Sequence, residues 1–252
     1  MLNNVKGVVK KTKGIVLRTV KYGETSVVVT VFTELFGVQT YIVNGIRAAS
    51  KKGSNKTNYF QPSALLDLVV YHNDFKNLQR IKEYKWVQLY NSIFSDVIKN
   101  SCAVFIIELL LKCLKEPEQH ADLFLFAEDA LLHLDNAEPA VTANFPLFFA
   151  LHMPGFFGFG IEDKHYEENM YLDLQEGVFI KDQPEHFIYL KGKEAESVSD
   201  ILKIRQPGEL ADIKLSQETR RHILIAVEQF YAYHLPGFGT LKTLPVLREL
   251  TS

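Results

Sequence analysis

The chain has 252 residues, 47% of them hydrophobic and 23% charged, which is typical of a globular protein with one large or a few small domains. This balance excludes a disordered or fibrous chain. Its longest uninterrupted apolar runs, such as 103–107 and 123–127, have five residues, whereas a membrane-spanning helix needs about 18 or more. The N-terminus lacks the apolar stretch and cleavage site of a secretion signal. We therefore expect a cytoplasmic protein with no membrane span.

Charge is distributed unevenly along the chain. Residues 1–86 contain 14 Lys and Arg against 5 Asp and Glu, whereas the remaining residues contain 14 against 25. A basic module with nine excess positive charges, attached to an acidic body, concentrates positive potential where a polyanion can dock. Nucleic acid is the polyanion that we expect, and the alternative is that the lysines only make a small β domain soluble.

Residues 14–84 show short β-branched runs separated by turn residues, which predicts β structure. Valines or threonines alternate along single faces of several runs. A long basic loop at 45–56 follows the third run. Five strands with one long connection after the third fit an OB-type Greek-key barrel, with an SH3-like barrel as the alternative. The predicted strands are 14–22, 26–33, 38–44, 64–71 and 78–84.

After Trp86 the apolar period becomes that of a helix, so we predict an α+β protein whose barrel domain (1–86) precedes a helical domain (87–252). Pro117 ends the first helix, and Ser216 is the expected N-cap of the last long helix. Residues 156–210 are read as an irregular insertion with short strands at 171–174 and 177–180. Two further helices are expected at 118–134 and 144–153, and the apolar stripe of the first helix comprises Ile93, Val97, Val104, Ile107, Leu111 and Leu114.

Two cysteines, Cys102 and Cys113, lie in the first predicted helix. Eleven residues of helix separate them by about 16 Å, beyond the roughly 7 Å limit for a disulfide, so both are expected to be buried thiols. No Cys-x-x-Cys occurs, which excludes a cysteine zinc site.

Motifs that carry chemistry are missing. The sequence has no phosphate-binding G-x-x-x-x-G-K-[ST] loop, no G-x-S-x-G elbow and no H-E-x-x-H helix. His165 lies near acidic residues such as Glu168, where a solvated acidic turn is the simpler interpretation than a metal site. Three other histidines are expected on apolar helix faces as core residues: His152, His222 and His234. We find no catalytic residues, no metal site and no cofactor, and we expect a protein that is not an enzyme.

Several segments, taken in order, resemble the RecO family of bacterial recombination and repair proteins. They are the Lys-Gly-Ile-Val-Leu-Arg run at 13–18, Tyr-Gly-Glu-Thr-Ser at 22–26, Val-Phe-Thr at 31–33, Phe-Gly at 36–37, Asn-Gly-Ile-Arg at 44–47, Gln-Pro at 61–62, and the run from Gly239 to Leu247. The match extends over the whole chain. It implies a mediator that binds and anneals single-stranded DNA, contacts double-stranded DNA, works with RecR, and helps a recombinase displace single-strand-binding protein.

In an OB barrel, strands two and three and the loops after strands one and four bind oligonucleotides. Cations neutralise phosphates there, and aromatic rings stack on bases. Tyr41 and Phe36 are candidates for stacking, with packing in the barrel core or a turn as the alternative. The expected DNA-binding residues are Lys13, Arg18, Lys21, Tyr22, Arg47, Lys51, Lys52, Lys56 and Lys76.

Residues 158–180 depart from the family pattern. Many members carry a four-cysteine zinc-binding insertion at this place, and this chain has no cysteine there, so we expect a degenerate, zinc-free version. Packing would have to hold its hairpin, through Phe157, Phe159, Tyr166, Tyr171 and Phe179.

The acidic tail of single-strand-binding protein would need an apolar pocket with a basic rim. Possible rim residues are Lys112, Lys115, Arg220 and Arg221, although exposed helix charges often serve only solvation. Two other functions stay open. One is a generic OB-fold protein that binds RNA or tRNA, and the other is a hydrolase that uses His165 or Glu168.

Overall fold

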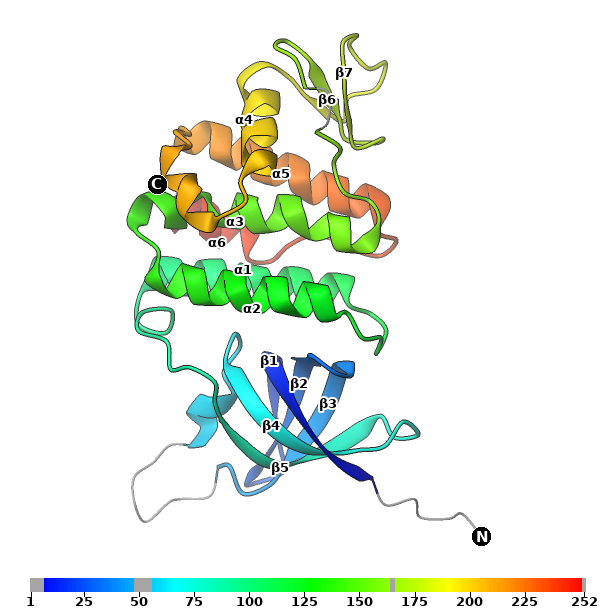
Figure 1. Ribbon diagram of the computed structural model, residues 1–252, viewed down its shortest axis with the longest axis vertical. Helices are drawn as coiled ribbons and strands as arrows, with labels where there is room; N and C mark the ends of the chain where they lie inside the picture. The colour runs from blue at the N-terminus through cyan, green and yellow to red at the C-terminus, as the bar shows by residue number, and fades with distance from the viewer. Residues whose placement is uncertain (1–6, 48–55, 164–165, 251–252) are drawn as a thin grey trace. The chain divides into compact units, whose positions relative to one another are not determined.

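The computed structural model describes residues 7–47, 56–163 and 166–250 (Figure 1). The chain forms two compact units. The first contains residues 1–90 together with 114–129, and the second contains residues 91–113 and 130–252. The barrel unit therefore includes a segment, 114–129, that the sequence patterns assign to the helical body.

The barrel unit consists of five strands that close in the order β1-β2-β3-β5-β4. All neighbouring pairs are antiparallel except β3 and β5, which are parallel. This five-stranded arrangement fits the OB-type fold expected from the sequence. The strands are β1 (Val8–Tyr22), β2 (Ser26–Thr33), β3 (Gly37–Val43), β4 (Leu65–His72) and β5 (Leu78–Trp86), and a short 3-10 helix, η1 (Lys56–Phe60), precedes β4.

Strand β1 is longer than expected, because residues 8–13 also belong to it. Lys10 and Lys11 pair with Val70 and Val69 of β4. From Gly14 onward β1 also pairs with β2, with a bulge between Val16 and Arg18. One long strand thus reaches around the barrel and connects two of its faces.

Side chains alternate between the inside and the outside of the barrel, and the inward ones form its core. The β2 valines at 27, 29 and 31 are at most 3% exposed, and Tyr41 of β3 is fully buried beside them. Gly37 begins β3 with φ +60°, and a Cβ there would overlap the carbonyl oxygen of Glu118. Only glycine suits both that backbone angle and that close approach.

Segment 114–129 joins the barrel through specific contacts. Lys13 of β1 forms an ion pair with Glu128 at 2.7 Å, and Phe32 of β2 meets Phe124 edge to face at 5.4 Å. The side chain of Gln119 also donates to the backbone oxygen of Glu34 at 3.1 Å. An ion pair, a ring contact and a hydrogen bond therefore hold this segment to the strands.

The second unit is built mainly from helices. Helix α2 begins in the first unit and ends in the second. Ser216 caps α5 as expected, because its hydroxyl accepts from the backbone N–H of Thr219. The helices are α1 (Val97–Cys113), α2 (Ala121–Asn136), α3 (Pro139–His152), α4 (Gly192–Lys203), α5 (Gln217–His234) and α6 (Leu244–Leu250), with the 3-10 turns η2 (Met153–Phe157) and η3 (Pro207–Asp212).

The expected apolar stripe of α1 was wrong in part. Val97 is 66% exposed, and Val104 and Leu111 are only half-buried. The helix instead buries Cys102, Ala103, Phe105, Ile106, Ile107, Leu109, Leu110 and Cys113. Apolar residues occur on nearly every side of this helix, so periodicity alone could not select the packed face. Both cysteines are buried free thiols, and burial raises the pKa of Cys102 to about 12.

Helix α3 runs through the core of this unit. Within the described residues, the segment Pro139–Phe157 is apolar and long enough to cross a membrane, with 67% of its window buried in the protein. The sequence did not predict this segment, because no uninterrupted apolar run in it is long enough to cross a membrane. Asn144, in the buried face, donates to the backbone oxygen of Ile213 at 2.8 Å and accepts from Arg220 at 3.1 Å. Protein groups surround this helix, as expected for a core helix.

Residues 156–210 contain more regular structure than expected. Strands β6 (Tyr171–Asp173) and β7 (Val178–Ile180) form the expected hairpin, and β8 (Tyr189–Leu190) adds a third strand in the order β7-β6-β8. Helix α4 was missed because it is mostly polar and buries small side chains such as Ala195 and Ser199. The expected packing is present in part, since Phe179 contacts Tyr166 at 5.0 Å between ring centroids.

Candidate nucleic-acid interface

The outer face of strands β1, β2, β3 and β5 carries two cross-strand rows of outward side chains. Strand register places Arg18 beside Thr30, Thr30 beside Thr40, and Thr40 beside Leu78. A second row follows two residues further along each strand and comprises Val20, Val28, Ile42 and Arg80. We call this surface, together with Tyr22 at the end of β1, the barrel face.

Burial confirms which way these side chains point. Val20 is 46% exposed, Tyr22 56% and Leu78 44%, whereas their strand neighbours Val27 and Gln79 are buried. Arg18 and Arg80 are exposed at opposite ends of the two rows. Neither arginine has an ion-pair partner among the described residues, and no residue of the barrel face is acidic.

The opposite surface of the barrel, around β4, has a different charge pattern. It displays Lys11, Lys13 and Lys85 together with Asp67 and Glu83. Lys85 lies 3.2 Å from Asp67, and Lys82 lies 3.4 Å from Glu83. These ion pairs neutralise Lys82 and Lys85, and the carboxylates of this surface repel phosphates, so we favour the barrel face as the surface for a polyanion.

The β1–β2 turn and the start of the β3–β4 loop meet at one end of the barrel face. The backbone N–H of Arg47 donates to the carbonyl of Thr25 at 2.9 Å, and its guanidinium donates to the carbonyl of Gly23 at 3.2 Å. Ile46 is buried and anchors the loop beside them. Arg47 is still exposed, so a cation is held against the β1–β2 turn, which directly follows the exposed Tyr22.

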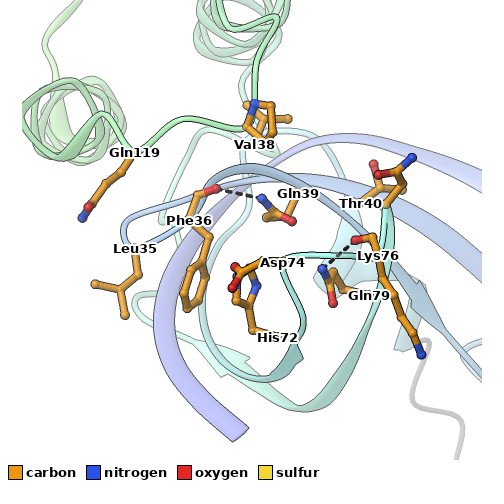
Figure 2. Close-up of a pocket in the computed structure, with 12 residues that line it drawn as sticks. Leu35, Phe36, Val38, Gln39, Thr40, His72, Asp74, Lys76, Gln79 and Gln119 are labelled. Atoms are coloured by element: carbon orange, nitrogen blue, oxygen red, sulfur yellow. Dashed lines mark hydrogen bonds and ion pairs between the residues drawn. The ribbon is translucent and has the colours of Figure 1, made fainter. Parts of the chain in front are cut away.

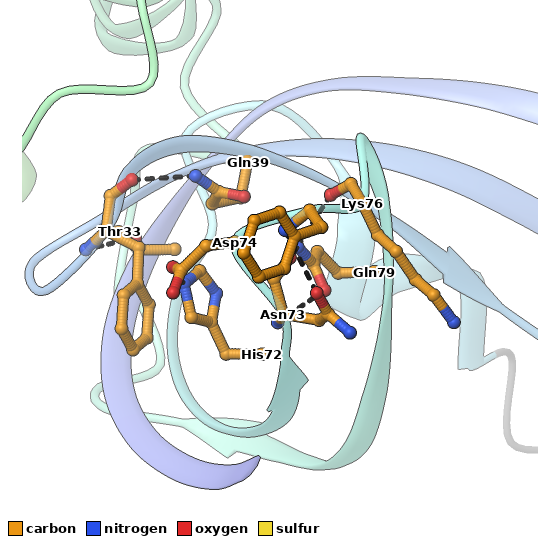
Figure 3. A network of polar contacts seen from close by, with 9 residues as sticks. Thr33, Gln39, His72, Asn73, Asp74, Lys76 and Gln79 are labelled. Atoms are coloured by element: carbon orange, nitrogen blue, oxygen red, sulfur yellow. Dashed lines mark hydrogen bonds and ion pairs between the residues drawn. The ribbon is translucent and has the colours of Figure 1, made fainter. Parts of the chain in front are cut away.

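The β4–β5 loop is held in one conformation by a buried amide. The side chain of Gln79 donates to the carbonyl oxygens of Asn73 and Lys76, each at 2.7 Å, and accepts from the N–H of Asn73 at 3.1 Å (Figure 3). Asn73 in turn accepts from the N–H of Phe75 at 2.9 Å. The loop therefore presents Phe75, which is 89% exposed, and Lys76 on a braced backbone.

A cavity of about 520 Å³ lies between the β2–β3 turn, β3 and the β4–β5 loop (Figure 2). Phe36 stacks on His72 in its wall, with ring centroids 3.8 Å apart. The imidazole of His72 is 2.9 Å from the carboxylate of Asp74. We call this space the β3 cavity; its walls are Leu35, Phe36, Val38, Gln39, Thr40, His72, Asp74, Lys76, Asn77, Gln79, Pro117 and Gln119.

The structure separates the predicted site residues into groups. Arg18, Lys21, Tyr22, Arg47, Lys56 and Lys76 are exposed on the barrel face or its loops. Lys13 forms an ion pair with Glu128, and the hydrogen bond between these two side chains raises the pKa of Lys13. Lys51 and Lys52 lie outside the described residues.

The two candidate stacking residues have different surroundings. Tyr41 is fully buried in the barrel core, so it presents no ring to a base, and burial raises its pKa. Phe36 is half-buried and stacks on His72. Arg80 was not among the predicted DNA-binding residues. It follows the buried Gln79 in β5, and because side chains alternate along a strand, Arg80 points outward.

Other candidate residues have structural partners. Arg220 is 9% exposed and binds Asn144, and burial lowers its pKa, so it does not contribute to a surface rim. Lys112 donates to the carbonyl of Phe238 at 2.6 Å. Lys115 and Arg221 are exposed.

The histidines differ from one another. His222 was expected in the core but is exposed and lies 2.9 Å from Glu194. His152 is half-buried against Phe148, and burial lowers its pKa, while His234 stacks on Phe159. His165 lies outside the described residues. Within those residues, no three His, Cys, Asp or Glu side chains are grouped to hold a metal ion.

Comparison with known proteins identifies the family. The model for the N-terminal part of recombination protein O matches residues 8–90, and the model for its C-terminal part matches residues 95–245. The chain belongs to the RecO family. It is 34% identical over 250 residues to the DNA repair protein RecO of Flavobacterium psychrophilum and 31% identical over 243 residues to that of Phocaeicola vulgatus. Each alignment covers 96% of this chain and 99% of the relative, so membership of this family supports a role in DNA repair.

Proposed function

We propose that this RecO-family protein is a recombination mediator that binds and anneals single-stranded DNA along the barrel face. The observation that carries this proposal is the absence of acidic residues from a face that bears two arginines without ion-pair partners among the described residues. Lys or Arg side chains that neutralise phosphates release counterions, and this release drives binding. The same surface can contact the backbone of double-stranded DNA, which is also a ligand in this proposal.

Exposed aromatic and apolar side chains distinguish this surface from a simple polyanion site. Tyr22 and the apolar centre of the two rows, formed by Val20, Val28 and Ile42, can face bases while Arg18 and Arg80 face phosphates. Single strands expose bases and phosphates together, whereas duplexes expose mainly phosphates. We therefore expect single strands to bind more tightly than duplexes of equal length.

The mediator role extends to two protein partners, as the family membership suggests. RecR and single-strand-binding protein are the expected partners, the protein acts without catalysing a reaction, and it works in the cytoplasm. The three-stranded sheet of β6, β7 and β8 takes the place of the zinc-binding insertion. We expect it to fold without metal, and the ring contact between Tyr166 and Phe179 supports this. Elemental analysis of the dialysed protein tests this last point, and one zinc per chain would contradict it.

Strand annealing provides the decisive test of the main proposal. Complementary oligonucleotides precoated with single-strand-binding protein should anneal faster with the wild type than with a double variant, Arg18→Glu and Arg80→Glu. Direct binding should show a log-log salt slope of about −3 to −4, as expected for roughly four to six phosphates on a single strand. A matched variant, Lys82→Glu and Lys85→Glu, makes the same charge change on lysines that already pair with acids. Equal annealing by both variants would contradict the assignment of the barrel face, and tighter binding to RNA than to DNA would favour a generic RNA-binding function.

A further inference from the structure

We propose that the β3 cavity binds one unstacked base of a single-stranded nucleic acid. This inference rests on the proposed function and adds a base-binding site to a phosphate-binding surface. The volume of about 520 Å³ lies within the range of roughly 300 to 1,000 Å³ that is typical of sites for small ligands.

The cavity is continuous with the barrel face. Thr40 lines the cavity and also belongs to the first row, where it lies between Thr30 and Leu78. A strand whose phosphates run from Arg18 in the first row to Arg80 in the second therefore passes Thr40 at the edge of the cavity. One base can turn into the cavity without any change in the path of the backbone.

The side chains that line the cavity can pair with the edge of a base, which presents hydrogen-bond donors and acceptors side by side. Gln39, Asn77 and Gln119 contribute primary amides, which offer both kinds of group. Figure 2 shows Gln39 and Gln119. Asp74 accepts from amino groups but repels phosphates, and Lys76 is the one lysine or arginine among the described residues that line the cavity. This balance favours a base over a free phosphate.

Some hydrogen-bonding atoms of these side chains have no partner among the described residues. Among the described residues, the side chain of Asn77 has no hydrogen-bond partner, and Gln39 uses only its amide nitrogen, which donates to the carbonyl of Phe36 at 2.8 Å. The Nδ1 atom of His72 is buried without a partner. Phe36 already stacks on this imidazole, so an incoming base would meet an aromatic wall that is half-exposed and fixed in place.

The cavity wall is preorganised. The Gln79 bonds fix the β4–β5 loop, which carries the lining residues Asp74, Lys76 and Asn77, before any ligand arrives. Figures 2 and 3 show Asp74, Lys76 and Gln79 at the cavity. The side chain of Thr33 similarly fixes the β2–β3 turn, because it accepts from the N–H of Phe36 at 3.0 Å and donates to the carbonyl of Gly37 at 2.8 Å. Binding a base therefore costs little ordering of these loops.

Two oligonucleotides of equal length separate base binding from phosphate binding. One is oligothymidine of about 20 nucleotides, and the other carries the same backbone with abasic sites throughout its central half. Wild-type protein should bind the base-bearing strand about fivefold or more tightly, the gain expected from at least one stacked base. Val38→Phe places a ring in the cavity from its β3 wall and should reduce this preference by about fivefold, with affinity for the abasic strand unchanged. Leu125→Phe, which adds the same ring on an exposed helix position, should retain the preference.

Each outcome has one meaning. An undiminished preference in Val38→Phe, or an equal loss for both strands, would overturn the cavity as the base site. Failure of wild-type protein to bind either strand would instead overturn the proposed function, and the inference with it. A measurement without any variant guards against misfolding of Val38→Phe: strands with 5-iodouracil should cross-link on irradiation to the segments 35–40 or 72–79. Cross-links confined to other segments would contradict the inference.

Discussion

Glu108 of α1 accepts two hydrogen bonds from Thr243, one from its backbone N–H at 2.8 Å and one from its hydroxyl at 2.6 Å, across 135 positions of sequence. The other carboxylate oxygen accepts from the N–H of Lys242 at 2.8 Å. Thr243 immediately precedes α6, so Glu108 satisfies donors at the start of that helix. The run from 239 to 247, which resembles the closing segment of the family, is thus held in place by a carboxylate from the first helix.

Replacement of Glu108 by alanine is expected to lower the free energy of unfolding by about 2 kcal/mol, because it leaves donors to a charged acceptor unpaired. Glu108→Gln should lose less, since one amide oxygen can still accept. Thermal and urea denaturation measure the effect, with Glu116→Ala on an exposed glutamate as the control. Equal stability of the two alanine variants would show that this carboxylate does not hold the C-terminal segment.

Lys13 and Arg18 lie on the same strand but should behave differently when changed to alanine. Arg18→Ala and Arg80→Ala should each make the log-log salt slope of single-strand binding shallower by about 0.7, the expected value for one lost phosphate contact. Lys13→Ala should leave the slope unchanged and lower the stability of the barrel unit, because Glu128 is 7% exposed and would be left as a buried, unpaired carboxylate. A shallower slope in Lys13→Ala would place DNA on the opposite surface of the barrel.

Asp135 predicts a pH dependence for the second unit. Burial alone would raise its pKa, but hydrogen bonds from the backbone N–H groups of Asn91, Ser92 and Ile93 outweigh burial and hold the pKa below the ordinary 3.8. A lowered pKa in the folded state stabilises the protein fully above 3.8, and this contribution disappears as pH falls through the folded value. Wild-type stability should therefore decrease below pH 4, and Asp135→Asn should be less stable at pH 7 and lose less on acidification. Parallel acid titrations of the two proteins would contradict this.

The sequence predicts well those elements whose buried face and ends are set by neighbouring residues. The β2 valines alternate between core and surface, and the expected ends of β2 agree with the structure because turn residues flank it. Helix α4 was missed because its buried side chains, such as Ala195 and Ser199, are small or polar. Val198 and Ile201 share its buried face, so the spacing of a helix is present in the sequence, but the polar residues around these two side chains make the signal short.

Pairing across long sequence separations explains the remaining errors in the candidate site. Lys13 looked like a DNA-binding cation until its partner Glu128, 115 positions away, was placed beside it. The sequence pattern of β3 does not settle which alternate side chains face the core. The register of β3 against β2 places Tyr41 in the core. Arg80 reaches the barrel face through the parallel pairing of β5 with β3, which sequence alone does not reveal.

The basic loop after β3 carries the last prediction. Its cations Arg47, Lys51, Lys52 and Lys56 lie within ten positions, and the glycines, serines and asparagines between them leave it few side chains to pack. Arg47 is exposed beside the β1–β2 turn and Lys56 is exposed at the start of η1, while the residues between them lie outside the described part of the chain. If this loop follows a phosphate backbone, changing all four to alanine should weaken single-strand binding strongly. The salt slope should become shallower by up to about 3, since each phosphate contact contributes roughly 0.7.

A matched variant isolates position from total charge. Alanine at Lys181, Lys191, Lys193 and Lys203 removes the same four charges from exposed positions in the second unit, and should change the slope little. Association with RecR, measured by co-sedimentation, should persist in both variants if the loop faces DNA. Loss of RecR association with unchanged DNA binding would assign the loop to the protein partner. Unchanged affinity at low and moderate salt would return the DNA site to the barrel face around Lys21, Tyr22 and Lys76, where the exposed cations have no ion-pair partner among the described residues.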